Sequence, residues 1–239
     1  MQVKDLFSNW MSNIINDINS ILLPKVCFGC NGKLYRGEHF LCTVCRHDLP
    51  FTEFNFTQEN AVDRIFYGRC HIKKASSFLY FYNPGKVKQL LHYLKYSRQK
   101  KIGNFLAQWF GQQILAENAL PTIDFIVPVP LHPKKQKKRG YNQLEGFGKE
   151  LAILLNTKYK ENALIKTANT KTQTKKNRLN RWLNTKNLYE PNPSVDLSNK
   201  TILLIDDVIT TGATIESCTN ALSKHENISI YVATIAFVP

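Results

Sequence analysis

A pair of acids and a short loop rich in hydroxyl groups are the residues best suited to carry chemistry. Asp206 and Asp207 directly follow the apolar run at 201–205, and a helical pattern begins at Ala213. The loop residues that matter are small or bear hydroxyls: Thr210, Thr211, Gly212, Ala213 and Thr214. Ligands of open α/β sheets bind at the carboxyl ends of strands. A loop that opens a helix also offers unpaired N–H groups to a phosphate.

The acids and the loop suit two parts of one ligand. Gly212 lets the backbone approach an anion closely, and threonine hydroxyls donate to further oxygens. Carboxylates repel phosphate, but they accept hydrogen bonds from sugar hydroxyls or hold Mg²⁺. The segment therefore predicts a sugar-phosphate site. Acids buried in an ion pair, or a loop without room for an anion, would contradict this prediction.

Other interpretations of the segment fit less well. The lysine of a GxxxxGK[ST] phosphate loop is missing, and the spacing is not GxGxxG. The remaining alternative is a structural turn with two helix-capping aspartates.

Four cysteines form a second chemical pattern. Cys27 pairs with Cys30, and Cys42 with Cys45, as two C-x-x-C motifs. Four thiolates complete the tetrahedral shell of one Zn²⁺ and leave no open position for catalysis. A module this short has no core of its own, so metal binding would supply most of its folding free energy. The alternatives are redox dithiols or unpaired core cysteines.

The remaining cysteines and nearby histidines receive structural roles. Cys70 and Cys218 lie outside the pattern and are predicted to be small core residues. His39, His47 and His71 could compete as metal ligands, but we predict that they lie on the surface.

The elements that position these groups follow from the hydropathy pattern. We predict strands at 78–82, 124–130, 201–205 and 228–237, and helices at 87–94, 103–117, 144–155 and 213–224. Strands that alternate with helices indicate an α/β fold with a mostly parallel sheet. The uninterrupted apolar run at 201–205 is typical of the centre of such a sheet.

The chain is predicted to have four parts. Residues 1–24 form an amphipathic helix, residues 25–50 the zinc module, residues 51–76 a connector and residues 77–239 the α/β domain. The first helix packs on its own protein or on a membrane surface or partner. Its polar face holds Asn, Ser and Asp rather than Lys, which disfavours the membrane.

Composition excludes several classes of protein. The 239 residues are 43% hydrophobic and 21% charged, which suffices for a core and argues against disorder. Lys and Arg number 32 against 18 Asp and Glu, so the net charge is +14 and an anionic partner is expected. No apolar run is long enough for a membrane span, and no secretory signal is evident. We therefore expect a cytoplasmic protein without disulfides.

The segment DDVITTGAT at 206–214 resembles the phosphoribosyl-pyrophosphate (PRPP) signature of type I phosphoribosyltransferases. More narrowly, the chain resembles the ComF family of competence-associated phosphoribosyltransferase-like proteins. Further pieces match in order: the paired C-x-x-C module, LKY at 94–96, IVPVPLHP at 126–133 with RGYNQ at 139–143, and TKTQ at 170–173 with Arg181 and Asn184. These matches cover residues 25–239. The resemblance implies a type I phosphoribosyltransferase fold, preceded by an N-terminal helix and a small zinc-binding module.

The resemblance also implies roles for individual residues. Asp206 and Asp207 match the acids that bind ribose hydroxyls, and residues 210–214 match the 5′-phosphate loop. Arg139 becomes the candidate catalytic cation beside pyrophosphate. Residues 170–184, which include Gln173 and Arg181, correspond to a mobile loop that is unusually rich in Lys and Asn here. The implied ligands are PRPP or another ribose 5-phosphate, Mg²⁺ bound with PRPP, and structural Zn²⁺.

Basic segments supply candidate contacts to pyrophosphate or nucleic acid. The stretch KKQKKR at 134–139 contributes Lys134, Lys135, Lys137, Lys138 and Arg139. This stretch and residues 166–186 are predicted to be loops that flank the phosphate site, and Lys95 belongs to a third cluster. These charges form either a solvated surface with pyrophosphate ligands or a groove for single-stranded DNA, with Tyr141 or Trp182 for stacking.

Two functions remain open. In the first, the protein keeps the PRPP pocket and handles single-stranded DNA during natural transformation, with competence-machinery proteins as partners. In the second, it is an active phosphoribosyltransferase of nucleotide salvage or related metabolism. No group of residues specifies an acceptor. The α/β body is too elaborate for a third option, a zinc-ribbon transcription factor.

Overall fold

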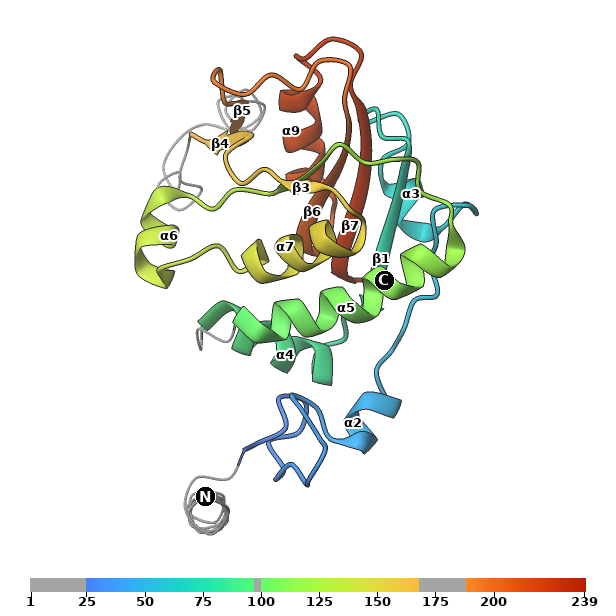
Figure 1. Cartoon of the computed structure of the whole chain (residues 1–239), viewed down its shortest axis with the longest axis vertical. Coiled ribbons are helices and arrows are strands. Elements are labelled where there is room, and N and C mark those ends of the chain that lie inside the picture. Colours follow the sequence, from blue (N-terminus) through green and yellow to red (C-terminus); the bar gives the residue numbers. More distant parts are fainter. Residues whose placement is uncertain (1–24, 97–99, 168–187) are drawn as a thin grey trace, which may run out of the picture. The chain divides into compact units, whose positions relative to one another are not determined.

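The computed structural model describes residues 25–96, 100–167 and 188–239 (Figure 1). The chain divides into two compact units, Met1–Leu49 and Pro50–Pro239. The predicted N-terminal helix and the whole predicted mobile loop at 170–184 lie outside the described residues, and with them Gln173, Arg181, Trp182 and Asn184. Residues 51–76, predicted as a connector, lie within the second unit.

The first unit is a small loop-rich module. A tight turn forms at Cys27, whose N–H donates to Gly32 O at 2.8 Å. Isolated antiparallel bridges pair Val26 with Lys33 and His39 with Leu41, and one short helix, α2 (Thr43–His47), follows. The buried hydrophobic residues of its described part are Cys27, Leu41, Cys45 and Leu49. So small a core agrees with a module whose stability depends on a bound metal.

The second unit is built on a five-stranded parallel sheet in the order β1-β7-β6-β2-β3. Its strands are β1 (Lys74–Tyr80), β2 (Phe125–Pro128), β3 (Lys158–Tyr159), β6 (Thr201–Ile209) and β7 (Ser229–Phe237). The predicted parallel α/β fold and the central place of the run at 201–205 are confirmed. Strand β6 extends four residues beyond the predicted end, so the acid pair belongs to the strand itself.

Helices cover this sheet (Figure 1). The described helices of the second unit are α3 (Ala61–Ile65), α4 (Lys86–Tyr96), α5 (Lys100–Glu117), α6 (Pro133–Arg139), α7 (Leu144–Leu154) and α9 (Ala213–Leu222), of which α4 packs on α5 and α6 lies to the side of the sheet. Helix α5 packs on α7, and α7 lies on β2, β3 and β6. Helix α9 packs on β6 and on a separate antiparallel hairpin formed by β4 (Leu164–Lys166) and β5 (Tyr189–Pro191).

The prediction of a loop at 134–139 is wrong, because this basic stretch forms helix α6. The His132 side chain accepts a hydrogen bond from Lys134 N and caps the first turn, and Pro133 suits the first helical position. Gly140 ends the helix with a left-handed backbone at φ 79°. These local signals outweigh the repulsion between neighbouring lysines.

No described helix has the length and apolar character that a membrane crossing requires.

Candidate functional site

The two acids of β6 lie side by side, each 8% exposed, but their partners differ. Asp207 N donates to Asp206 Oδ1 at 2.8 Å. Asp207 Oδ2 lies 2.7 Å from Lys95 Nζ and accepts a hydrogen bond from Gln143 Nε2 at 3.1 Å. Asp207 is therefore held in an ion pair, whereas Asp206 has no ion pair with any residue in the described part of the chain.

The surroundings of Asp206 also shift its pKa. Burial, and next the charge of Asp207, raise the pKa of Asp206 to about 8, while Lys95 and Lys166 oppose the shift. A carboxyl group that burial leaves poorly solvated benefits from new hydrogen-bond donors when a ligand binds. The ion pair that would weaken the sugar-phosphate prediction is thus confined to Asp207, and Asp206 remains available to a ligand.

The loop after β6 leaves room for a small anion. A hollow of about 50 Å³ is lined by Asp206 and residues 208–215. Thr210, Thr211 and Thr214 are exposed there, and helix α9 begins after Gly212. The first N–H groups of a helix have no partner within the helix, so they are free to meet an oxyanion.

Gly212 is required here for a reason that sequence did not reveal. Its φ of 74° lies in the left-handed region, which favours glycine. A Cβ at this position would also lie 2.6 Å from Ile65 Cγ2 and 2.9 Å from Phe66 Cε1. The loop is therefore packed directly against α3 and the residue that follows it.

Arg69 supports the same loop and was missed by the sequence analysis. Its Nη1 donates to Thr211 O at 2.7 Å, while Nε and Nη2 donate to Glu216 Oε2 at 3.1 and 2.5 Å. The guanidinium thus ties the loop to the first turns of α9. Arg69 lies 142 residues before Thr211 in a segment predicted to be a connector, so no local signal marked it.

We predict that Arg69→Ala weakens binding of ribose 5-phosphate about tenfold, because losing hydrogen bonds made by a charged group typically costs about 1.5–3 kcal/mol. Titration calorimetry with ribose 5-phosphate measures the change. Arg64→Ala is the matched control, since Arg64 pairs with Glu59 on the exposed surface. Unchanged affinity in Arg69→Ala would show that the clamp does not shape the loop.

A chain of polar contacts connects α6 to the acids. Gln143 accepts from Arg139 Nη1 at 2.6 Å and donates to Asp207, and the Arg139 guanidinium lies 5.1 Å from the centre of the Tyr96 ring. The structure therefore brings two predicted cations, Lys95 and Arg139, close to the acid pair. Gln143 lay within the RGYNQ motif, but no role was predicted for it.

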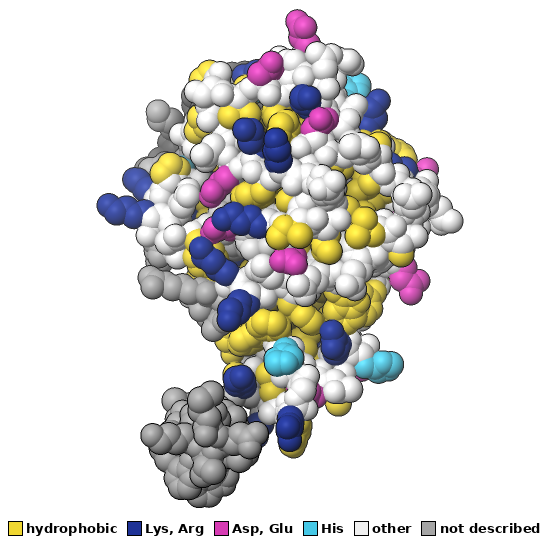
Figure 2. Space-filling view, in the orientation of Figure 1, with side chains coloured by type: hydrophobic (Ala, Val, Ile, Leu, Met, Phe, Trp, Pro, Cys, Tyr) yellow, Lys and Arg dark blue, Asp and Glu magenta, His cyan; other side chains and the backbone are white. Residues whose placement is uncertain are grey.

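The other predicted cations lie on α6. Lys134, Lys135 and Lys137 are exposed, and Figure 2 shows dark blue side chains along the edge formed by this helix. Lys138 is part of the same helix, but its side chain is not among those described. Lys166, from β4, was not singled out as a ligand. It donates to Tyr189 OH at 2.7 Å. Burial, and next the charge of Lys135, lower the pKa of Lys166, while the charge of Asp206 opposes the shift.

The four cysteines of the first unit form one cluster, with all four sulfur atoms within 4.8 Å of one another. Cys30 Sγ and Cys42 Sγ are 3.9 Å apart, close to the about 3.8 Å expected for thiolates around tetrahedral Zn²⁺. Backbone N–H groups point at the sulfurs, as Cys42 N does to Cys27 Sγ at 3.2 Å. The cluster can hold a metal ion such as zinc.

Electrostatics in the cluster also suit a cation. Burial works against ionisation of Cys27, but backbone N–H groups of Cys42, Gly29 and Cys30 lower its pKa to about 7. Burial and the neighbouring cysteines raise the pKa of Cys45. Four thiolates together therefore need a bound cation to neutralise them.

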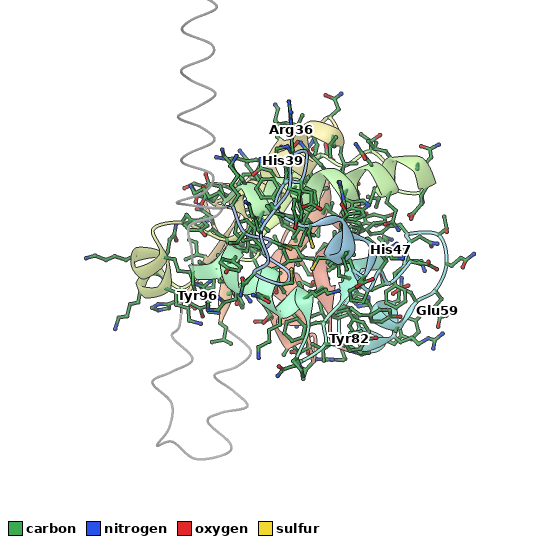
Figure 3. All side chains as sticks on the ribbon, turned by 90° about the horizontal axis from the view of Figure 1, so that it is seen from below. Arg36, His39, His47, Glu59, Tyr82 and Tyr96 are labelled. Atoms are coloured by element: carbon green, nitrogen blue, oxygen red, sulfur yellow. The ribbon has the colours of Figure 1, made fainter. Side chains whose placement is uncertain are left out.

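Two further cysteines and three histidines lie outside the cluster. Cys218 is fully buried, as predicted, but Cys70 is only half-buried. The histidines at 39, 47 and 71 are exposed, as predicted, and Figure 3 labels the first two at the surface of the first unit.

Part of the second unit matches a known family of domains. Residues 141–239 match the family model of the phosphoribosyl transferase domain, and together with the parallel sheet this defines the second unit as a phosphoribosyltransferase-type fold. A hypoxanthine phosphoribosyltransferase from Staphylococcus aureus is similar at 14% identity, with a TM-score of 0.37, over 59% of this chain and 65% of that one.

Curated relatives extend over most of the chain. DNA utilization protein YhgH of Escherichia coli (strain K12) is 25% identical over 89% of this chain and 96% of its own length. Competence protein F of Haemophilus influenzae is 26% identical over 83% of this chain and 90% of its own length. Competence protein ComFC of Bacillus subtilis is 27% identical over 83% of this chain and 78% of its own length. The chain is a homologue of these proteins, which confirms the resemblance to the ComF family.

Proposed function

We propose that the protein binds PRPP or ribose 5-phosphate together with Mg²⁺ and handles single-stranded DNA in the cytoplasm during natural transformation. The first part rests on one observation: the buried acid Asp206 lines an anion-sized hollow at the start of α9. Titrating the protein with PRPP and MgCl₂ while recording its thermal unfolding tests this part.

Each group at the site has a defined task in this proposal. Asp206 accepts hydrogen bonds from ribose hydroxyls, and Asp207 is kept in place by Lys95 and Gln143. The loop N–H groups and threonine hydroxyls hold the 5′-phosphate, while Arg139 approaches the pyrophosphate. Carboxylate oxygens suit Mg²⁺, which would be held by Asp206 and would neutralise phosphate charge. The bound cation would favour the ionised form of Asp206 and so lower its raised pKa.

The cysteine cluster is proposed to be a structural zinc site. All four ligands are thiolates, so no position is open to substrate. The metal would stabilise the described part of this unit, which buries very few apolar side chains.

The names of the relatives, which refer to competence and DNA utilization, support the second part of the proposal. So do the net charge of +14 and the exposed lysines of α6. Each lysine that neutralises one phosphate contributes to affinity through counterion release.

We predict that replacing Lys134, Lys135 and Lys137 by Ala weakens binding to oligo(dT) at low salt by at least about tenfold. The slope of log K against log salt should fall by about 2, since single strands contribute about 0.7 per phosphate contact. Fluorescence anisotropy over a salt series measures both. Replacing Lys158, Lys200 and Lys224 removes the same charge elsewhere on the domain and serves as the control. Equal losses in both variants would refute a DNA contact at α6.

Transfer of the phosphoribosyl group is the second candidate function. The phosphoribosyl transferase domain match and the acid pair favour it. In that reaction the bond from C1 of the ribose to pyrophosphate breaks while a bond to the acceptor forms, and cationic groups stabilise the departing pyrophosphate. Release of pyrophosphate from PRPP across a panel of base, amide and amine acceptors tests it.

A further inference from the structure

Helix α4 presents a row of flat side chains that ends at α6. His92 and Tyr96 lie one helical turn apart, and their ring centres are 5.0 Å apart with the ring planes tilted by 40°. The Arg139 guanidinium, at the end of α6, lies 5.1 Å from the centre of the Tyr96 ring. An imidazole, a phenol and a guanidinium group therefore lie in one row. The two rings have no role in the proposals above.

The rings of this row face solvent. Tyr96 is 61% exposed, His92 is also exposed, and Figure 3 labels Tyr96 at the surface of the second unit. Leu91 and Leu94 of the same helix are buried, so the apolar face of α4 does not include the two rings. Exposed aromatic rings beside a cation offer π faces to a flat ligand.

The end of α4 that carries Tyr96 is anchored by its neighbours. Leu94 is fully buried, and its carbonyl oxygen accepts a hydrogen bond from Tyr141 OH at 2.6 Å. Lys95 Nζ lies 2.7 Å from Asp207 Oδ2. Tyr141, predicted from the sequence as a stacking residue, is only 6% exposed and anchors this helix instead. The helix end is thus fixed before a ligand binds, which lowers the entropic cost of binding at Tyr96.

The charge around the row favours a polyanion. Neither α4 nor α6 contains an acidic residue. Lys88 is exposed on α4, and Lys134, Lys135 and Lys137 are exposed on α6. Helix α6 has seven residues and is therefore about 10 Å long. Phosphates bound on its lysines and a base bound at Tyr96 can thus belong to one short stretch of a strand.

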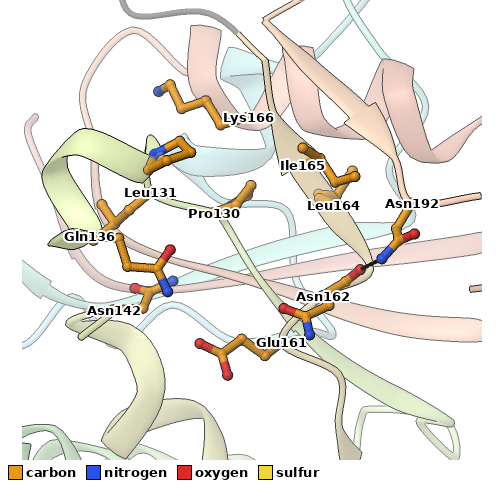
Figure 4. Close-up of a pocket in the computed structure, with 11 residues that line it drawn as sticks. Pro130, Leu131, Gln136, Asn142, Glu161, Asn162, Leu164, Ile165, Lys166 and Asn192 are labelled. Carbon is orange, nitrogen blue, oxygen red and sulfur yellow. Dashed lines mark hydrogen bonds between the residues drawn. The ribbon is translucent and has the colours of Figure 1, made fainter. Parts of the chain in front are cut away.

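Figure 4 shows the side of α6 that faces the β4–β5 hairpin. Gln136 lines a cavity of about 200 Å³ there. The three exposed lysines of α6 are not among the residues that line this cavity. They therefore remain on the surface, where a strand that reaches Tyr96 can contact them.

We propose that His92 and Tyr96 form a stacking platform for a base of single-stranded DNA, with the Arg139 guanidinium at one end of the row. Every base has a flat π face, so the platform contributes affinity without reading sequence. The faces of a base within a duplex are covered by its neighbours, so the platform favours single strands. This inference rests on the proposed function, which supplies the single-stranded partner.

Tyr96→Ala tests the platform by fluorescence anisotropy with two labelled probes. One probe is oligo(dT), and the other is a strand of equal length that carries the same phosphates and sugars but no bases. We expect Tyr96→Ala to bind oligo(dT) at least about fivefold more weakly, which is the lower end of what stacking on one base contributes. Binding of the abasic strand and the dependence on salt should stay unchanged, because no phosphate contact is lost.

Two control variants accompany this measurement. Tyr96→Phe keeps the ring and should bind both probes as the wild type does. Tyr67→Ala removes a tyrosine that is also 61% exposed but lies outside α4 and α6, and it should likewise bind as the wild type does.

The outcomes separate the platform from the proposed function. Unchanged binding of oligo(dT) by Tyr96→Ala, an equal loss with both probes, or equal affinity of the wild type for the two probes would overturn the platform. If the α6 lysine variant loses affinity for oligo(dT) and Tyr96→Ala does not, DNA handling stands and only the platform is contradicted. If the wild type binds neither probe at low salt, DNA handling and the platform both fail.

Discussion

Replacing both acids, Asp206→Asn with Asp207→Asn, should abolish stabilisation of the protein by PRPP and Mg²⁺. In the proposal Asp206 accepts hydrogen bonds from ribose hydroxyls. Hydrogen bonds to a charged acceptor contribute about 1.5–3 kcal/mol each, so losing two of them should weaken binding by at least about 100-fold. Thermal unfolding with increasing PRPP measures this directly, because a ligand that binds only the folded state raises the midpoint.

The variant should remain folded. Burial makes the charged form of Asp206 unfavourable, so a neutral amide at 206 relieves this cost. Asp207→Asn leaves Lys95 without its partner, but the Lys95 side chain is 25% exposed and can turn to water. Circular dichroism and the unfolding midpoint without ligand check this.

Single variants separate the two acids. Asp206→Asn removes the acid that is available to the ligand and keeps the ion pair between Lys95 and Asp207, so it should reduce affinity for PRPP without changing the cations of the site. Asp207→Asn breaks that ion pair and frees Lys95. Asp196→Asn, an exposed acid whose side chain is 81% exposed, is the control. Undiminished stabilisation of the double variant by PRPP would place the sugar elsewhere.

Cys42→Ser should release the metal and expose the first unit to protease. Structural zinc contributes about 10–16 kcal/mol in small zinc modules, and the described part of this unit buries very few apolar side chains. Metal content by mass spectrometry should fall from one equivalent towards zero, and limited proteolysis should cut within Met1–Leu49.

This substitution removes a metal ligand without disturbing the local backbone. The Cys42 side chain caps α2 by accepting a hydrogen bond from Cys45 N at 3.4 Å, and serine is a good residue for such a cap. The helix start is therefore preserved while the thiolate is lost. Cys70→Ser, outside the cluster, should keep its zinc. Stoichiometric zinc in Cys42→Ser would contradict a site of four thiolates.

Local patterns were enough to predict the main elements and the parts of the site that are continuous in sequence. Hydropathy periodicity located the four longest described helices and the four principal strands of the α/β domain, because burial of one helix face or a whole strand leaves a repeating signal. The acid pair, its loop and the C-x-x-C pairs were found for a similar reason, since each gathers its groups within a few residues.

Contacts between distant segments were decided only by the tertiary structure. Arg69 meets Thr211 across 142 residues. Lys95 reaches Asp207 from α4, and Gln143 reaches it from the position just before α7. A lone arginine, lysine or glutamine carries no periodic signal, so nothing in the sequence indicated which acid would be paired and which would stay available.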